Sequence, residues 1–413
     1  MSEASSKVQS SDNFSNKILI AALAFLSVGR FDPSFVPLSA GGLTANQIGF
    51  YLITITLSCL SLRYIRVWPF STYFGAAILA MSIWALLSPS WSAAPSAAFA
   101  KAISYTFTMM TAVYISRRMT INEIVSGALY GLFAVVLISA LLAIALPSTA
   151  GSTMFHPGAW RGLFMQKNVL GRAALLLAVF SYVVIYSPDL YRVKKFAKVS
   201  LIISILVLLE TKSVTAIAVF VVFSFALPIF IYLRSRGPIY RSLLLLAVLV
   251  LAPTMVLVIE PFISWFAELT GKSMTLSGRV PLWDFAIRKL QASPYTGFGI
   301  EGFFGTHFDY EFFAEQKWIA EHAHNGFLDL ALELGLVGLG IMLIAVFRFA
   351  SVIPSPENSM RTLSVSMISI ISLIVFLNVT ESNLFRSSNF IWLLFLVFGF
   401  YRQKLATKAI RQN

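Results

Sequence analysis

Long apolar runs separated by short polar connections dominate the chain. A helix needs about twenty apolar residues to cross a bilayer, and twelve runs approach or reach that length. The predicted spans cover residues 18–31, 43–62, 70–88, 99–116, 121–146, 169–187, 199–211, 213–233, 242–259, 325–347, 362–380 and 389–401. The pattern therefore predicts an all-α integral membrane protein of about twelve transmembrane helices.

Composition excludes an ordinary soluble domain. Hydrophobic residues make up 58% of the chain and charged residues 12%, whereas a soluble domain carries about 25% charged residues. So little polar material suits helices whose sides face lipid, where backbone groups must be satisfied internally. The single cysteine, Cys59, lies in an apolar run and excludes both an intramolecular disulfide and a cysteine-based metal site.

The two ends of the chain differ in character from its middle. Residues 1–16 are polar and serine-rich, which predicts a disordered cytoplasmic tail. This segment contains no cleavage site typical of a secretory signal. Residues 17–413 are expected to form a single polytopic membrane domain.

The distribution of positive charge predicts orientation. The net charge is +13, and most of the 31 Lys and Arg residues fall in alternate connections and in the C-terminal tail, whereas segment 88–98 has none. Cytoplasmic connections carry this excess in membrane proteins, so both termini are expected to be cytoplasmic. No basic tract alternates with aromatic residues, and we expect no nucleic-acid partner.

Several cations oppose this rule because they lie on the predicted outer side. They are Arg161, Lys167, Arg172, Lys212, Arg279 and Arg386. Ionisable groups at membrane depth are costly and tend to be functional. The alternative, that they reach outward to lipid phosphates, stays open for Arg172 and Arg386.

One predicted outer loop is long, at about residues 260–323 between the ninth and tenth spans. Loops of this length are usually functional, and this one is rich in Trp and Phe. Within it, Trp283, Ile287 and Leu290 share one face of a helix over 279–291, which predicts an amphipathic helix in the membrane interface. We expect the loop to act as a lid that carries Arg279 over a pocket.

Two segments combine charge with predicted helix starts. Arg161, Lys167 and Asn168 surround the start of the sixth span, and a helix N-terminus with nearby cations is an anion site. The alternative is a charged interface cap. Before the tenth span, His324 is suited to proton transfer, and Asn325 and Glu333 lie on one helical face.

A metal site at His322 and His324 is the competing interpretation. It needs further ligands, and His156 and His307 are the only other histidines. The sequence therefore predicts no metal and no cofactor.

In order and spacing these residues resemble the O-antigen ligase superfamily, which includes O-antigen ligases and Wzy-type polysaccharide polymerases. The resemblance covers about residues 160–400. The matching positions are Arg161, Gly162, Lys167, Asn168, Gly171, Ser277, Gly278, Arg279, Trp283, Gly297, Gly299, His324, Asn325, Leu328, Glu333, Gly335 and Gly338. Glu381 and Ser382, before the last span, resemble the exopolysaccharide-polymerase branch.

The resemblance implies a metal-independent glycosyltransferase that polymerises undecaprenyl-pyrophosphate-linked oligosaccharides at the periplasmic face of the inner membrane, in exopolysaccharide or O-antigen biosynthesis. It implies that His324 is catalytic and assists the attacking hydroxyl. The implied substrate-binding residues are Arg161, Lys167, Asn168, Lys212, Arg279, Asn325 and Glu333. Membrane lipid, a chain-length regulator and export machinery are the other implied partners.

One position departs from the family pattern. Family members often carry a cation where this chain has Val214, within the run 211–216. Lys212 is expected to substitute from two residues away. Two alternatives to a polymerase stay open: a ligase that transfers glycan to a lipid or protein acceptor, and a flippase or other transporter of lipid-linked oligosaccharides. A transporter would favour ionisable residues at mid-membrane on several spans, whereas here they concentrate at one face.

Overall fold

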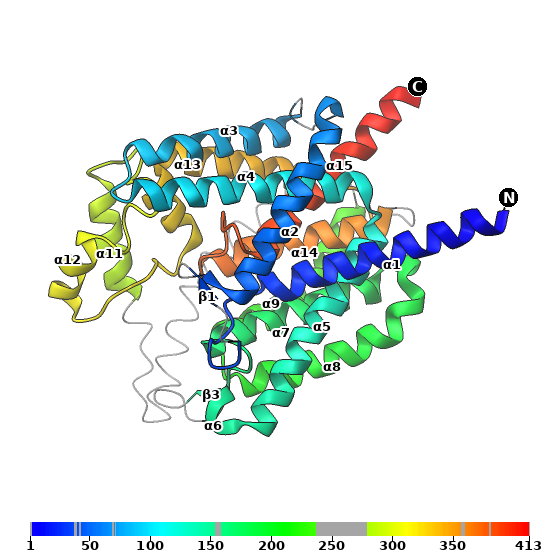
Figure 1. Cartoon of the computed structure of the whole chain (residues 1–413), viewed down its shortest axis with the longest axis horizontal. Helices are drawn as coiled ribbons and strands as arrows, with labels where there is room; N and C mark the ends of the chain where they lie inside the picture. The colour runs from blue at the N-terminus through cyan, green and yellow to red at the C-terminus, as the bar shows by residue number, and fades with distance from the viewer. Residues whose placement is uncertain are drawn as a thin grey trace.

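A computed structural model gives the architecture of the chain (Figure 1). It describes residues 2–36, 39–40, 43–67, 70, 72–152, 158–236, 279–356, 360–379 and 381–412. The helices run roughly side by side as a bundle, and both termini lie at the end opposite to α11 and α12 (Figure 1).

Helices account for nearly all regular structure in the described residues. The long helices are α1 (Ser2–Ser27), α2 (Ala45–Ser61), α3 (Tyr73–Leu87), α4 (Pro95–Arg118), α5 (Ile121–Ala145), α7 (Lys167–Tyr186), α8 (Lys194–Glu210), α9 (Val214–Ser235), α13 (Gly326–Ser351), α14 (Arg361–Asn378) and α15 (Phe390–Gln412). The shorter ones are α6 (Pro147–Ala150), α11 (Arg279–Leu290), α12 (His307–Gln316) and the 3-10 helices η1 (Leu62–Val67), η3 (Ser88–Ser90) and η4 (Pro188–Val193). Two antiparallel pairs of two-residue strands complete the list: β1 (Ser39–Ala40) with β2 (Leu43–Thr44), and β3 (Gly151–Ser152) with β4 (Ala159–Trp160).

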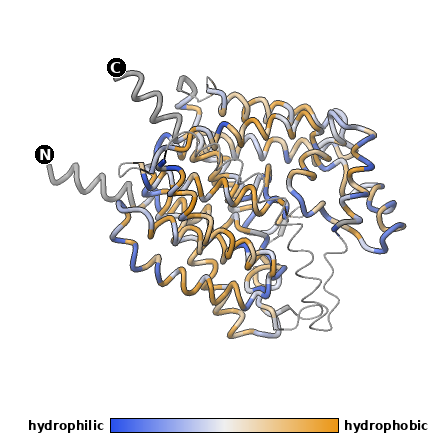
Figure 2. The backbone as a smooth tube through the Cα atoms, turned by 180° about the vertical axis from the view of Figure 1, so that it is seen from behind, coloured by the Kyte–Doolittle hydropathy of each residue, from blue (hydrophilic) through white to orange (hydrophobic). Residues whose placement is uncertain are grey.

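The all-α integral membrane fold is confirmed. Eleven of the predicted spans correspond to helices, and the ninth, 242–259, lies outside the described residues, as does 260–278 of the predicted loop. Among the described residues, seven helices are long and apolar enough to cross a membrane, and two shorter apolar helices cover Phe14–Ser27 and Phe390–Tyr401. Apolar residues follow the helices, whereas hydrophilic ones gather towards their ends and on α11 and α12 (Figure 2).

Helix α14 forms the centre of the bundle. Its apolar stretch is 94% buried, against 33% for the stretch in α9. Two serines of α14 bond to carbonyls of their own helix: Ser366 to Thr362 (2.7 Å) and Ser372 to Ile368 (2.8 Å). These bonds satisfy the hydroxyls where water is excluded.

Helix α1 begins at Ser2, and the disorder of residues 1–16 stays a prediction. The apolar half of α1 packs closely on α5, where a Cβ added to Gly131 would lie 2.2 Å from the carbonyl oxygen of Ala21. Packing on α5 stabilises the apolar half of α1 as a helix. The helix can then extend towards the N-terminus, because each further residue adds one backbone hydrogen bond. Residues 2–16 contain neither Pro nor Gly to end it.

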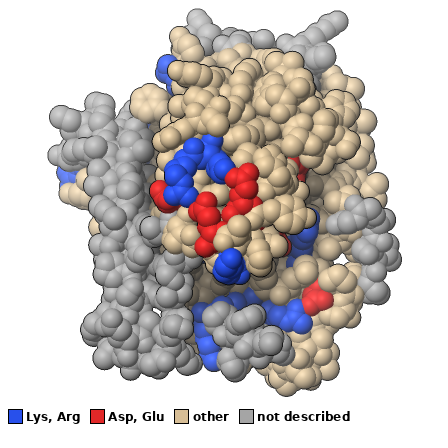
Figure 3. Space-filling view, turned by 90° about the vertical axis from the view of Figure 1, so that its left-hand side faces the viewer, with Lys and Arg blue, Asp and Glu red and all other residues tan. Residues whose placement is uncertain are grey.

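Helices α11 and α12 form a small module with its own apolar core. Leu282, Phe285 and Ala286 of α11 are buried in it, whereas Ile287 is exposed. The buried face is therefore shifted from the one predicted through Trp283, Ile287 and Leu290, because α12 rather than lipid covers it. Acidic and basic side chains mark the surface at this end of the molecule (Figure 3).

Helix α13 is broken two turns from its start. Gly335 has φ +69° and ψ −174°, so the helix continues only after an extended residue. The preceding loop fills the break: the Leu336 amide donates to the Pro294 carbonyl (2.8 Å), and the Phe298 amide donates to the Leu332 carbonyl (2.8 Å). Such a break is tolerated at membrane depth when other protein groups satisfy the freed backbone.

Candidate active site

A cavity of about 350 Å³ opens at the end of the bundle that carries α11 and α12. It lies between the end of α1, the starts of α7 and α9, the loop before α13 and the loop after α14. Its lining residues are Arg30, Gln166, Asn168, Val169, Arg172, Ser213, Thr215, Ala216, Glu321, His322, Leu377, Glu381, Ser382 and Arg386. Three arginines and two carboxylates thus border one small space.

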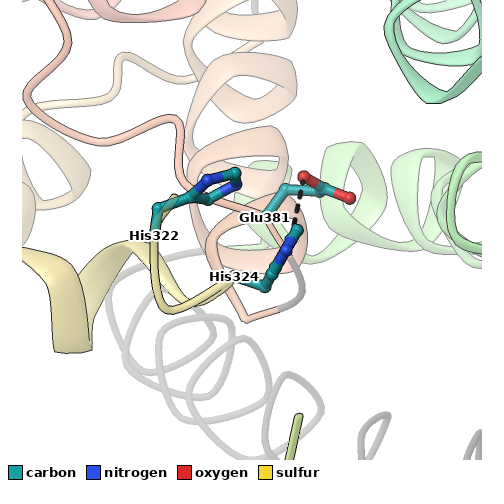
Figure 4. Close-up of side chains that lie close together, drawn as sticks. All are labelled: His322, His324 and Glu381. Atoms are coloured by element: carbon teal, nitrogen blue, oxygen red, sulfur yellow. Dashed lines mark ion pairs between the residues drawn. The ribbon is translucent and has the colours of Figure 1, made fainter. Parts of the chain in front are cut away.

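The loop before α13 places His322 in the cavity lining and His324 close by, facing Glu381 (Figure 4). His324 directs Nδ1 towards Glu381 Oε2 at 3.9 Å, and the rings of His322 and His324 lie with centroids 4.1 Å apart. Asn325 caps α13, because its Oδ1 accepts from the amides of Phe327 (3.1 Å) and Leu328 (3.2 Å). The substrate-binding role predicted for Asn325 is therefore joined by a structural one.

Glu381 is a carboxylate held among cations. Arg279 Nη2 lies 3.6 Å from its Oε1. Burial alone would raise the pKa of Glu381, but contact with His324 and the charges of Arg279 and Arg172 outweigh burial and lower it. Glu381 is therefore ionised at neutral pH and can hold an imidazole in one orientation.

His322 differs from its neighbour in its surroundings. Burial, followed by the nearby His324, lowers the pKa of His322 to about 4. A neutral imidazole thus lines the cavity, where it can donate or accept one hydrogen bond to a ligand.

Two arginines of the cavity face neutral groups or solvent. Arg172 donates to Asn383 Oδ1 (3.0 Å) and to the Val28 carbonyl (3.1 Å), neither of which carries a charge. Arg30 is exposed at the cavity. In contrast, Arg386 is paired with acidic residues of α13. Arg30 and Arg172 are therefore the cations best placed to meet an anionic ligand.

The N-termini of α7 and α9 meet at the same cavity. Gln166, Asn168 and Val169 line it from α7, and Ser213 and Thr215 line it from α9. Neither N-cap residue, Gln166 or Ser213, bonds its side chain to its own helix in the described structure. Free amides and the helix dipoles at two starts add to the positive potential.

The predicted cations stand in different places. Arg161 pairs with Asp32 and also donates to the carbonyls of Gly151 (3.2 Å), Phe164 (3.1 Å) and Thr149. These contacts occupy the guanidinium and tie the loop before α7 to the end of α1. Arg161 is not among the described residues that line the cavity.

The two predicted lysines stand beside the cavity rather than in its lining. Lys167 donates to the Lys212 carbonyl (3.2 Å), and Lys212 has a left-handed backbone with φ +49°. Their neighbours Asn168 and Ser213 do line the cavity and are joined by a hydrogen bond of 3.1 Å. Lys167, Asn168 and Lys212 therefore lie close together, but only Asn168 lines the cavity.

Glu333 lies deeper, on α13. Arg386 Nη1 is 3.7 Å from Glu333 Oε1, and Arg386 Nη2 is 3.2 Å from Asp329 Oδ2. Glu333 thus contributes to a buried ion cluster behind the cavity, one turn beyond Asp329. The structure gives it a contact with Arg386 rather than a place in the cavity lining.

A carboxylate that could ligate a metal, Glu381, stands beside the two histidines, and the sequence did not indicate this grouping. One ligand atom from each of His322, His324 and Glu381 lies within 4.8 Å of the others. His156 lies outside the described residues, and His307 instead pairs with Glu311 on α12 at 3.8 Å. Their spacing would suit a metal, but Arg279 occupies the other side of Glu381, and a cation there disfavours a second one.

One family model and three known proteins are similar to this chain. The O-antigen ligase family model matches residues 199–343. The exopolysaccharide production protein ExoQ of Rhizobium meliloti is 27% identical over 277 residues, which cover 63% of this chain and 61% of ExoQ. A putative polysaccharide ligase of Rickettsia bellii is 29% identical over 205 residues, covering 46% of this chain and 48% of that protein. One of Rickettsia conorii is 28% identical over 205 residues, covering 46% and 47%.

The chain is similar to the O-antigen ligase family over residues 199–343. It spans less than two thirds of the length of each of these relatives. The family match includes His324, Arg279 and Lys212 but neither the start of α7 nor the loop after α14. The latter two segments supply Arg172 and Glu381, which therefore rest on the geometry of this chain alone.

Proposed function

We propose that this protein is a polysaccharide polymerase that joins undecaprenyl-pyrophosphate-linked oligosaccharide repeats at the periplasmic face of the inner membrane. One observation carries the proposal: an arginine-lined cavity lies directly beside the facing pair His324 and Glu381. A polymerase of this kind must stabilise a departing pyrophosphate and remove a proton from a sugar hydroxyl, and these two groups of residues suit those two tasks.

The cavity would hold the phosphates of the donor. Arg30 and Arg172 supply charge, and the amide-rich starts of α7 and α9 supply hydrogen-bond donors. Arg279, Lys167 and Lys212 stand around this space and extend the positive field. Arg161 is assigned to the scaffold, because Asp32 and three carbonyls already occupy its guanidinium.

His324 would act as the general base. With Nδ1–H directed at Glu381, the neutral imidazole keeps Nε2 as its acceptor. The oxygen of the acceptor hydroxyl attacks the anomeric carbon, the bond between that carbon and the phosphate oxygen breaks, and the hydroxyl proton passes to Nε2. The electron pair of the broken bond leaves with the pyrophosphate, whose charge the arginines stabilise. This chemistry uses no metal and no cofactor.

A ligase is the second candidate, because two relatives carry the name putative polysaccharide ligase. Both activities would use the same donor and the same base, and they differ in the acceptor. A transporter fits less well, because the cavity and its ionisable residues lie at one end of the bundle. For a polymerase, the expected partners are a chain-length regulator and export machinery. Both termini of the chain are expected to be cytoplasmic.

The polymer profile of a deletion strain tests the proposal. Loss of a polymerase should leave single lipid-linked repeats, whereas loss of a ligase should accumulate long lipid-linked chains. The glycans are separated by size after extraction of the lipid carrier, and the deletion is complemented with the wild-type chain. A normal profile in the deletion strain would exclude both functions.

A further inference from the structure

Ala323, between the two histidines, is held at both of its backbone polar groups. Its amide donates to Asp329 Oδ1 at 2.7 Å, and its carbonyl accepts from Trp283 Nε1 at 2.7 Å. Asp329 comes from α13 and Trp283 from α11, so two separate elements hold one residue. Ala323 is completely buried, and both bonds are therefore shielded from water, where each is costly to lose.

This clamp lies next to a strained residue. His324 has φ +51°, in the left-handed region that side chains rarely adopt. Such a conformation costs about 1–3 kcal/mol and persists only where the surroundings impose it. The clamp fixes the chain before His324, and the cap formed by Asn325 fixes it afterwards. The direction of the imidazole thus follows from its neighbours.

Asp329 also reaches the loop that carries Glu381. Its second oxygen, Oδ2, accepts from the Ser382 hydroxyl and from Arg386 Nη2 (3.2 Å). Asp329 is only 4% exposed, and removing a partner of so deeply buried a carboxylate is strongly destabilising. One side chain therefore ties the histidine loop to the loop that contains its carboxylate partner.

We propose that Asp329 and Trp283 are positioning residues that hold His324 against Glu381. This inference rests on the proposed role of His324 as the base. Asp329 sets the distance between the two loops through its two oxygens. Trp283 makes the geometry depend on docking of α11, so the base is correctly oriented only when the α11–α12 module lies on the bundle.

The test uses the full-length chain in proteoliposomes, with lipid-linked oligosaccharide extracted from the deletion strain as substrate. The side chain of Asn has only one acceptor oxygen, so in Asp329→Asn it can accept either from Ala323 or from Ser382 and Arg386, but not from both sides. The resulting small misplacement of His324 should lower kcat roughly 100-fold. In Trp283→Phe one hydrogen bond is lost, and kcat should fall about tenfold. KM should stay within about twofold in both, and kcat is expressed per folded protein, because partial unfolding alone would also lower apparent kcat at constant KM.

Two further variants sharpen the result. Trp84→Phe is the matched control, because Trp84 Nε1 also donates to α13, at the Leu334 carbonyl (3.0 Å), but near the break. It should keep wild-type kcat. The double variant Asp329→Asn with Trp283→Phe should lose less than the product of the single losses, since both act on Ala323.

Wild-type kcat in Trp283→Phe, or losses found only in KM, would overturn the inference. Should Asp329→Asn fail to fold, Trp283→Phe still decides it. His324→Gln separates this failure from that of the proposed function. An active His324→Gln variant would show that His324 is not the base, so the proposed function itself would fail. An inactive His324→Gln variant together with a fully active Trp283→Phe variant would refute only the positioning role.

Discussion

His324 and Glu381 face one another across 3.9 Å although 57 positions separate them in sequence. The histidine precedes α13 and the glutamate follows α14, so the two helices bring their ends together at the cavity. The distance is longer than a hydrogen bond, and catalytic contacts often tighten only when substrate is bound. The pair resembles the base and orienting carboxylate found in many hydrolases, here placed at a membrane surface.

Glu381→Gln should lower the rate about 10²–10⁴-fold while the protein accumulates normally, because the amide no longer favours the productive tautomer of His324. Polymer yield and single-turnover rate with extracted lipid-linked repeats measure the loss. Glu315→Gln, on the exposed side of α12, serves as the control. A Glu381→Gln variant with wild-type turnover would show that the carboxylate has no part in catalysis.

The lowered pKa of Glu381 gives this prediction a pH dependence. A carboxyl group whose pKa is depressed in the folded protein contributes fully above its ordinary value, 4.5, and its contribution is lost as the pH falls through the depressed pKa. Glu381 therefore stays ionised throughout pH 5–8. Any acid loss of activity in that range belongs to another group, and Glu381→Gln should not abolish it.

Arg161 and Arg172 should separate stability from activity. Arg161→Gln breaks a partly buried pair with Asp32 and should cost on the order of 3 kcal/mol in stability, with residual polymerisation. Arg172→Gln gives up hydrogen bonds to two uncharged acceptors and the attraction between its charge and Glu381. It should lose less stability than Arg161→Gln but should lose polymer, because the donor phosphate loses its cation. Thermal melting in detergent and polymer yield in cells measure the two effects. The reverse outcome would return Arg161 to the phosphate site.

The fold was largely predictable from the length of apolar runs. Backbone groups in lipid must bond within their own segment, so a run of suitable length has few alternatives to a helix. The break at Gly335 could not be predicted in this way, because it depends on the Pro294 carbonyl reaching the Leu336 amide from a distant segment. The buried face of α11 was misjudged for the same reason, since α12 covers Phe285.

The site was predictable where its residues share one segment. His324 and Asn168 were found because a helix start and a polar side chain occur together in sequence. Arg30 was not selected, and Glu381 was noted only for its family resemblance, since each stands at the end of a different helix and the two meet only in the folded chain. The pairing of Arg161 with Asp32 could not be predicted, because the two residues are distant in sequence. Of the cations on the predicted outer side, Arg172 and Arg386 line the cavity.

Chelation should leave activity unchanged. His322, His324 and Glu381 are close enough to hold a metal, but Arg279 already neutralises the glutamate. Polymerisation in proteoliposomes treated with EDTA should match the untreated rate, and metal analysis of the purified protein should find less than one equivalent of zinc. Loss of activity on chelation, restored by added zinc, would replace the acid–base mechanism with a metal-dependent one.

The α11–α12 module is predicted to move during the cycle. It is tied to α4 by the ion pair between Lys101 and Glu301. A reducible thiol crosslinker between cysteines at 101 and 301, in a Cys59→Ser background, should stop turnover until it is reduced, because lids gate access to a site. A crosslink within the module, between positions 288 and 315, is the control. Normal turnover of the crosslinked protein would mean a static module.

Gly335 should be among the least replaceable residues of α13. A Cβ at this position would lie 2.0 Å from the Tyr295 carbonyl oxygen, and φ +69° disfavours any side chain. Gly335→Ala should therefore cost at least about 2 kcal/mol in stability through backbone strain and steric overlap.

Gly340 offers a matched control on the same helix, because nothing lies within 4 Å of its added Cβ. Gly340→Ala should be neutral or stabilise by up to about 1 kcal/mol, since Ala favours the helix over Gly. The melting temperatures of Gly335→Ala and Gly340→Ala in detergent are compared. A lower value for Gly335→Ala means that the break in α13 is a fixed part of the fold. Equal temperatures would mean that α13 can close into a continuous helix, and that the loop before it is not wedged into the bundle.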